Sequence, residues 1–329
     1  MKCKKIIGQR DMRTKSVFCI FTLVLLFVPV STAFCSLDLL VTSRNTNSVL
    51  RYDGATGQFI GEFVSSASGG LNAPGGIALG FDGNLYVTSS YLGKSSVLRF
   101  NGNTGDFIDV FCDPRSSSPY AGLIFGPKQD LYTATETYEN VYHYNGQTGE
   151  FINEFLSGGN NMATVGLTFG PDDNLYVSNI FNKSIDRYDG KTGVFIDEFA
   201  SSTGFFEICP LGLKFGSDGN LYASGDSGVY RFNGNTGEYI DQFVPSGSGG
   251  LELPINLTFG PDNNLYVCNF NAGEVLRYNG QTGDFIDIFA TGGGLDCAAD
   301  LLFIPEPNLA SLMCFGSILL IHRRKTSKI

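Results

Sequence analysis

The chain has 329 residues, a net charge of −10, 42 glycines and 13% aromatic residues. This composition, without long polar helical patterns, predicts an all-β fold. The two terminal segments hold ten of the 22 basic residues but only two of the 32 acidic ones, so residues 36–304 have 12 basic and 30 acidic residues and a net charge near −18. That balance excludes nucleic acid and anionic lipid as favoured partners.

Residues 1–35 have the pattern of an export signal. Basic residues lie on both sides of Met12, an apolar run extends from Val17 to Val30, and small residues follow up to Ala33. Basic, apolar and small residues in this order are typical of a secretory signal peptide. Met1 and Met12 are both acceptable starts, because the basic residues after Met12 complete the pattern. We expect cleavage after Ala33 or after Cys35.

One unit recurs six times with a period near 45 residues. Its clearest part reads RYDGATGQFIGEF at residues 51–63, and the Gly of its Thr-Gly pair returns at 57, 105, 149, 193, 237 and 283. Asp-Gly or Asn-Gly between alternating apolar runs predicts a hairpin. A second hairpin, such as GLTFGPDDNLYV at residues 166–177, precedes it in five units. Four strands per unit, which we name a to d in chain order, predict a six-bladed β-propeller with four-stranded antiparallel blades.

The ends of the repeat region predict how the ring closes. LDLLVTS at residues 37–43 matches the second strand of the other units, so the first unit lacks its own strand a. DLLFIP at residues 300–305 matches the strand a that begins at residue 256. We therefore expect one propeller over residues 36–304, closed by pairing its last strand with its first. This closure leaves no unpaired seam.

The units resemble the NHL family of propellers over about residues 37–304. The shared features are Gly-Leu-x-Phe, Asp-Gly-Asn, Leu-Tyr-Val and the outer hairpin. The resemblance implies the fold more firmly than the function, because such propellers bind proteins, nucleic acids or sugars and related six-bladed rings act as lactonases.

Strand b is followed by a polar position in most units, on the face where propellers usually place their sites. The candidate ligand-binding residues at or next to this position are Arg44, Glu136, Asn179, Asp226 and Asn269. They predict a shallow polar pocket. The alternative interpretation is that they are ordinary polar residues at the start of a loop.

An enzyme is the alternative to a binding scaffold. In the gluconolactonase family, Glu, Asn and Asp hold a divalent cation, and Glu136, Asn179 and Asp226 supply those residue types here; this resemblance implies a lactonase or esterase. His143 occupies a position that is Arg in the other units, and His322 lies near the C-terminus, so neither predicts a general base. We assign no catalytic residue. A purely structural matrix protein is the third alternative.

Calcium is the one candidate cofactor. Turns such as Asp82-Gly83-Asn84 collect oxygen ligands, although tight turns require the same residue types for conformational reasons. Separately, Cys268 and Cys297 are expected on one face, where a disulfide would staple the closure. The alternative is that they are two unrelated small apolar residues.

The C-terminal segment, residues 305–329, consists of Pro305-Glu306-Pro307, an apolar run from Leu309 to Ile321 and a basic end. It resembles the PEP-CTERM sorting signal, which implies an exosortase-type processing enzyme as a partner in a bacterium with an outer membrane. A plain hydrophobic anchor is the alternative, although the run is short for a membrane span. In both cases the tail contacts the membrane before any cleavage.

We therefore expect an exported protein located in the cell envelope or outside the cell. It would act as a binding scaffold for a protein or carbohydrate ligand, with a link to an exopolysaccharide matrix.

Overall fold

The computed structural model describes residues 37–91, 94–112, 120–135, 140–156, 166–201, 209–226 and 228–306. All of them belong to the unit that runs from Cys35 to Ile329. The predicted signal peptide, the sorting tail beyond Glu306 and the candidate ligand Glu136 lie outside these residues. No helix in the described part of the chain has the length and apolar character of a membrane span.

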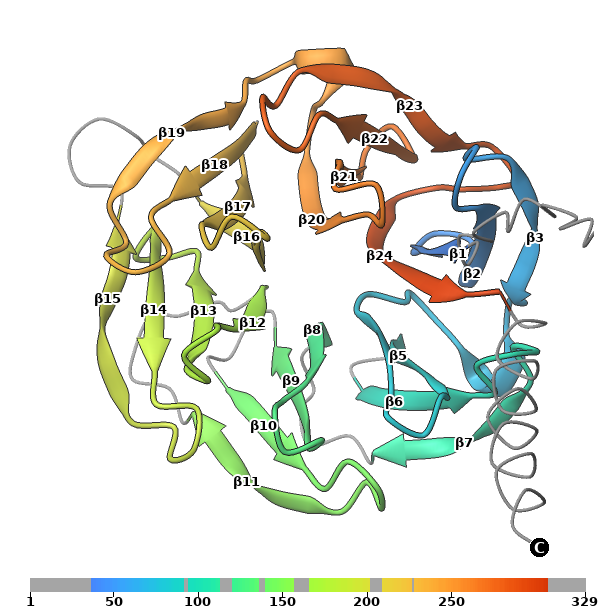
Figure 1. Ribbon diagram of the computed structural model, residues 1–329. Helices are drawn as coiled ribbons and strands as arrows, with labels where there is room; N and C mark the ends of the chain where they lie inside the picture. Colours follow the sequence, from blue (N-terminus) through green and yellow to red (C-terminus); the bar gives the residue numbers. More distant parts are fainter. Residues whose placement is uncertain are drawn as a thin grey trace, which may run out of the picture. The chain divides into compact units, whose positions relative to one another are not determined.

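Six four-stranded sheets form the blades of a propeller, and every paired strand is antiparallel, which confirms the predicted fold (Figure 1). The strands of blades 1 to 3 are β24 (Ala298–Pro305), β1 (Leu37–Ser43), β2 (Ser48–Asp53) and β3 (Phe59–Val64); β4 (Ile77–Leu79), β5 (Leu85–Tyr91), β6 (Lys94–Phe100) and β7 (Phe107–Cys112); and β8 (Tyr120–Phe125), β9 (Leu131–Thr135), β10 (Val141–Tyr144) and β11 (Phe151–Leu156).

The strands of blades 4 to 6 are β12 (Leu167–Phe169), β13 (Leu175–Asn179), β14 (Ser184–Tyr188) and β15 (Phe195–Ser201); β16 (Pro210–Phe215), β17 (Leu221–Gly225), β18 (Gly228–Phe232) and β19 (Tyr239–Val244); and β20 (Pro254–Phe259), β21 (Leu265–Asn269), β22 (Glu274–Tyr278) and β23 (Phe285–Thr291). Two short 3-10 turns, η1 (Ser68–Gly70) and η2 (Ser248–Gly250), lie before strand a of blades 2 and 6. The first strand of each blade faces the centre of the ring (Figure 1).

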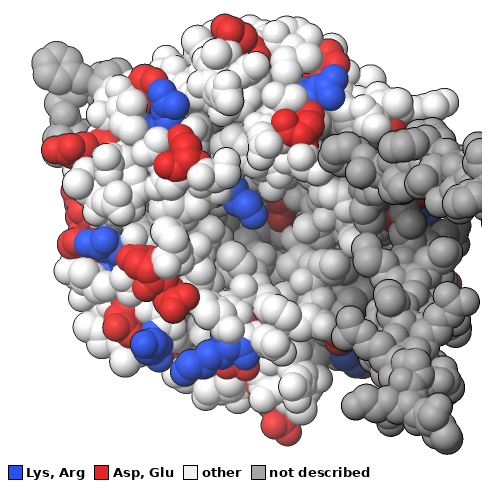
Figure 2. All heavy atoms as spheres, viewed as in Figure 1, with Lys and Arg blue, Asp and Glu red and all other residues white. Residues whose placement is uncertain are grey.

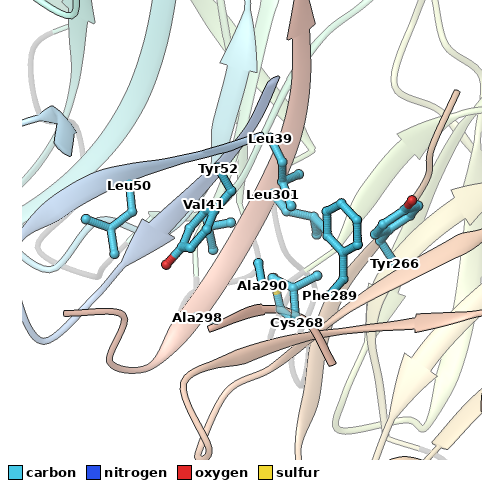
Figure 3. Packing of buried hydrophobic residues seen from close by; sticks show 11 residues of the cluster. Leu39, Val41, Leu50, Tyr52, Tyr266, Cys268, Phe289, Ala290, Ala298 and Leu301 are labelled. Atoms are coloured by element: carbon cyan, nitrogen blue, oxygen red, sulfur yellow. The ribbon is translucent and has the colours of Figure 1, made fainter. Parts of the chain in front are cut away.

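The last strand completes the first blade, as predicted. Blade 1 has the order β24-β1-β2-β3, with Leu37 opposite Pro305 and Val41 opposite Leu301. Strand β1 therefore has hydrogen-bonded partners on both sides. Figure 3 shows the buried cluster at this seam, where Leu39 and Leu301 lie near Phe289 of blade 6.

Neighbouring blades are joined by one repeated aromatic contact. The Tyr of strand b meets the Phe of the next blade's strand a edge to face, with ring centroids 4.9–5.2 Å apart. The pairs are Tyr86–Phe125, Tyr132–Phe169, Tyr176–Phe215, Tyr222–Phe259 and Tyr266–Phe303. At the sixth interface Leu40 replaces the Tyr and Leu79 replaces the Phe, and both pack into one core cluster. Because both aromatic residues are replaced by Leu, the two smaller side chains still pack against the same core at this interface.

Candidate ligand-binding channel

The innermost strands enclose a cavity of about 330 Å³, lined by residues from β4, β8, β12, β16, β20 and β24. Figure 2 shows it as the hollow at the centre of the ring. Side chains alternate along a strand, so every second residue of strand a faces the channel while its neighbours enter the core. Leu213, for example, is buried whereas Lys214 is exposed.

Two positions of strand a carry the chemistry of the channel. In blades 2 to 6 and then blade 1, the first position holds Gly76, Gly122, Gly166, Gly212, Asn256 and Asp300. The second position holds Ala78, Ile124, Thr168, Lys214, Thr258 and Leu302 in the same order. Glycine keeps the first position open where strands of adjacent blades meet; a Cβ on Gly166 would lie 2.0 Å from the carbonyl oxygen of Leu211. Lys214 and Asp300 are thus departures from a small or apolar ring.

Lys214 is the basic residue among the described residues that line this cavity. It makes no hydrogen bond or ion pair within the described part of the chain, and Asp300 is the charged group that acts on it. Its side chain reaches solvent through the channel, but protein surrounds it on the sides. This enclosure lowers the pKa of its ammonium group, because the charged form loses hydration.

Asp300 lies two blades from Lys214, on the closing strand β24. Its carboxylate accepts the backbone N–H of Ile77 at 3.0 Å and that of Leu301 at 2.8 Å. Burial raises the pKa of Asp300 to about 7, and these two donors and the Lys214 charge only partly oppose that effect. Two hydrogen bonds use about half of the acceptor capacity of a carboxylate, so Asp300 can accept more.

The channel has a polar and an apolar sector. The polar sector comprises β16 with Lys214, β20 with Asn256 and Thr258, and β24 with Asp300. The side chains of Asn256 and Thr258 make no hydrogen bond with other described residues. The apolar sector consists of β4 and β8, whose channel-facing side chains are Ala78 and Ile124, with Phe81 beyond the end of β4.

The raised pKa of Asp300 predicts a pH-dependent stability. The native state holds this proton more tightly than the unfolded chain, so the stabilisation is complete below about pH 4 and is lost as the pH rises through about 7. Between these values Asp300 alone lowers the free energy of unfolding by up to about 1.4 kcal/mol per pH unit. We expect Asp300→Asn to show a shallower fall than the wild type between pH 5 and 8 in urea unfolding, whatever its absolute stability. Parallel curves would contradict the assignment.

The structure does not gather the predicted ligand-binding residues at the channel, since none of the four that it describes lines this cavity. Asn179 is buried and binds Asp186 and the backbone of Asn182 within its own turn. Asn269 is buried and holds the preceding loop through Glu252 and Gly250. Their amides are already used.

Arg44 and Asp226 lie in the b-to-c turns of blades 1 and 5. The backbone N–H of Arg44 binds the carbonyl of Cys297 at 3.1 Å, and the exposed Asp226 accepts the N–H of Cys209 at 3.2 Å. Ser89 and Ser43 likewise bind the loops that enter strand a of their blades. In blades 1, 2, 5 and 6 a residue at the end of strand b therefore anchors the loop that enters strand a, whereas Asn179 of blade 4 holds its own hairpin.

Of the residues that a gluconolactonase-like site would use, the structure describes Asn179 and Asp226, and a side-chain oxygen of each accepts a backbone N–H. The carbonyl oxygen of Asn179 accepts the N–H of Asn182, and Asp226 accepts that of Cys209. No group of three or more His, Cys, Asp or Glu that could hold a metal occurs among the residues described. We derive no metal-dependent step from them.

The Asp-rich turns have their own hydrogen bonds. Asp82 accepts the backbone and side-chain N–H groups of Asn84 and the hydroxyl of Tyr86, at 2.7–3.0 Å. Asp172, Asp218 and Asp262 repeat this pattern. These contacts lower the pKa of Asp82 against the opposing effect of burial. These hydrogen bonds within the turn account for the Asp and Asn residues on conformational grounds. Calcium binding stays a prediction.

The predicted disulfide is not formed in the structure, where Cys268 and Cys297 are free. Cys268 is fully buried and packs against Ala290 and Ala298 in the seam cluster (Figure 3). Cys297 is partly exposed, and its sulfur accepts the side-chain N–H of Asn45 at 3.1 Å. The Cys268 thiol thus lies in the core, whereas the Cys297 thiol lies at the surface.

His143 is a structural variant of the repeat. Its ring stacks on Tyr132 with centroids 4.5 Å apart and binds Asp130 and Asn153, both at 3.1 Å. In blade 2 the corresponding Arg99 binds Asp109 and lies over Phe111. The side-chain pair His143–Asn153 therefore replaces the Arg–Asp pair that links strands c and d in blade 2.

Lys214 and Asp300 are not among the predicted ligand-binding residues, all of which lie at the ends of strand b. The signal was present: alternate positions of the six aligned strands hold small, apolar or neutral residues in all but these two cases. A comparison of the channel-facing positions would have found both.

No protein-family model and no curated protein matches this sequence. Solved structures do match. A chain of a nidogen/laminin complex has a TM-score of 0.63 at 14% identity and covers 82% of this chain and 99% of its own; a Bacteroides caccae protein of unknown function has 0.61 at 12%, with the same coverage. A gluconolactonase from Xanthomonas campestris has a TM-score of 0.55 at 17% identity, covering 70% of this chain and 78% of its own. At these identities the chain shares with them a β-propeller fold.

Proposed function

We propose that this protein is an exported, envelope-associated scaffold that binds a small polar ligand in the central channel of its propeller. The observation that carries the proposal is Lys214, an ammonium group that faces the cavity without a hydrogen-bond or ion-pair partner among the described residues. A ligand that enters the channel with an acceptor can pair with this ammonium group, and a hydrogen bond to a charged group contributes more than a neutral one.

The size and lining of the cavity support a small-molecule ligand. Ligand cavities commonly measure about 300–1,000 Å³ and combine apolar walls with a few polar groups. This one has about 330 Å³ and an apolar sector. Four of its polar side chains have unused hydrogen-bonding capacity, namely Lys214, Asn256, Thr258 and Asp300. Export and the exosortase-type processing partner are proposed from the pattern of residues 1–35 and the order of parts in residues 305–329.

Ligand capture tests this function. We expect immobilised wild-type protein, exposed to a small-molecule extract of spent culture medium, to retain at least one compound that Lys214→Met does not retain, as read by mass spectrometry. Lys191→Met is the matched control, because Lys191 is exposed on an outer turn of blade 4. Retention of the same compounds by all three proteins would place binding elsewhere.

A further inference from the structure

The channel presents one basic and one acidic side chain that do not pair with each other. Lys214 on β16 and Asp300 on β24 line one cavity, and each acts electrostatically on the other. Lys214 nevertheless forms no ion pair with any described residue. A ligand that reaches both groups therefore needs a negative end and a positive end.

The strand between them contributes neutral hydrogen-bonding groups. Strand β20 lies between β16 and β24 in the ring, and its Asn256 and Thr258 line the same cavity with unused donors and acceptors. An amide offers both a donor and an acceptor, and so do Asn and Thr side chains. The polar sector thus has the order ammonium, amide and hydroxyl, carboxylate.

The opposite wall is apolar and extends to an exposed aromatic ring. Ala78 and Ile124 face the cavity, and Phe81 at its mouth is 64% exposed with its ring edge-on to Phe125 at 6.1 Å. Pro or Ser takes the Phe81 position after strand a in the other blades. A large apolar side chain exposed beside a cavity gains free energy when a ligand covers it.

We infer that the channel binds a short zwitterionic peptide: its carboxylate at Lys214, its peptide group at Asn256 and Thr258, its ammonium at Asp300 and an apolar side chain against β4 and β8. The inference rests on the proposed function and names its ligand class. A dipeptide separates its charges by about two residue rises, roughly 6–7 Å, and carries an amide between them, as β20 lies between the two strands with the charged groups. A single amino acid holds its charges closer together and lacks the central amide.

Four probes separate the parts of this ligand in isothermal titration calorimetry: alanyl-leucine, N-acetyl-alanyl-leucine, alanyl-leucinamide and leucine. We expect wild-type protein to bind alanyl-leucine roughly tenfold or more tightly than each of the others, since each blocked peptide lacks one charge-assisted hydrogen bond and leucine lacks the central amide. Similar affinities for all four probes would contradict the inference.

Protein variants assign each end of the probe. In Lys214→Met the free acid and the amide should bind within about twofold of each other, and in Asp300→Asn the free and acetylated peptides should do so. Thr258→Val, which keeps both charges, should weaken every peptide probe, and it tests the inference if Asp300→Asn does not fold. Lys191→Met should bind all probes as the wild type does. A variant that keeps the wild-type preference contradicts the assignment of that end.

The two proposals fail in different ways. If no probe binds while the culture extract still yields a ligand that depends on Lys214, the peptide inference is wrong and the proposed function stands. If the extract yields none and no probe binds, both are wrong.

Discussion

A chain that ends at residue 297 should fail to fold, whereas one that ends at residue 306 should melt like the full-length protein. The shorter chain lacks β24 and with it the buried Leu301 and Ile304. Removing two large buried side chains costs about 4–10 kcal/mol, which approaches the whole stability of a typical domain, and β1 also loses a row of backbone hydrogen bonds. Circular dichroism and thermal unfolding measure the difference.

A synthetic peptide of residues 298–306 provides the control for this truncation. If β24 acts only as a strand of blade 1, the peptide should restore cooperative unfolding to the shorter chain in a concentration-dependent way. A shorter chain that folds without the peptide would show that the closing strand is dispensable.

Gly105→Ala should destabilise the propeller by at least about 3 kcal/mol, against about 1 kcal/mol for Gly83→Ala. Both glycines have a φ of +76°, so both changes introduce the same backbone strain. A Cβ on Gly105 would lie 1.8 Å from the carbonyl oxygen of Phe63 in blade 1, while a Cβ on Gly83 would meet nothing within 4 Å. The difference therefore measures the close approach of two blades.

Urea unfolding gives both free energies from one experiment. The contact recurs in all six Thr-Gly hairpins, and Gly237, for example, lies in the same way against Phe199 of the preceding blade. Equal costs for the two substitutions would mean that neighbouring blades can move apart without loss.

The architecture was predictable because local signals repeat. Each Thr-Gly turn requires a positive φ, and the six turns therefore mark six hairpins before any tertiary contact is known. The closing strand followed from alignment, since Asp300 to Pro305 copies the pattern of the inner strands. The matched exchange of Leu40 and Leu79 was not predicted, because single-sequence reasoning does not show which side chains face each other across two blades.

The site was less predictable for the same reason. Polar residues after strand b looked available for a ligand, but the side-chain amides of Asn179 and Asn269 already form hydrogen bonds with the nearby backbone. Lys214 and Asp300 are 86 residues apart in sequence and share a cavity only because the chain closes into a ring. Alignment of the six inner strands identifies both residues as the charged exceptions, but it does not show how close together they lie.

The pairing of Leu37 with Pro305 also means that the ring has no structurally privileged starting point. A short linker between these neighbouring ends, combined with a cut at one of the exposed turns between strands c and d, would yield a circular permutant with the same blades and the same channel. In such a permutant Asp300 and Thr42 would belong to one uninterrupted stretch of chain, and their hydrogen bond at 2.9 Å would no longer depend on the meeting of the first and last strands.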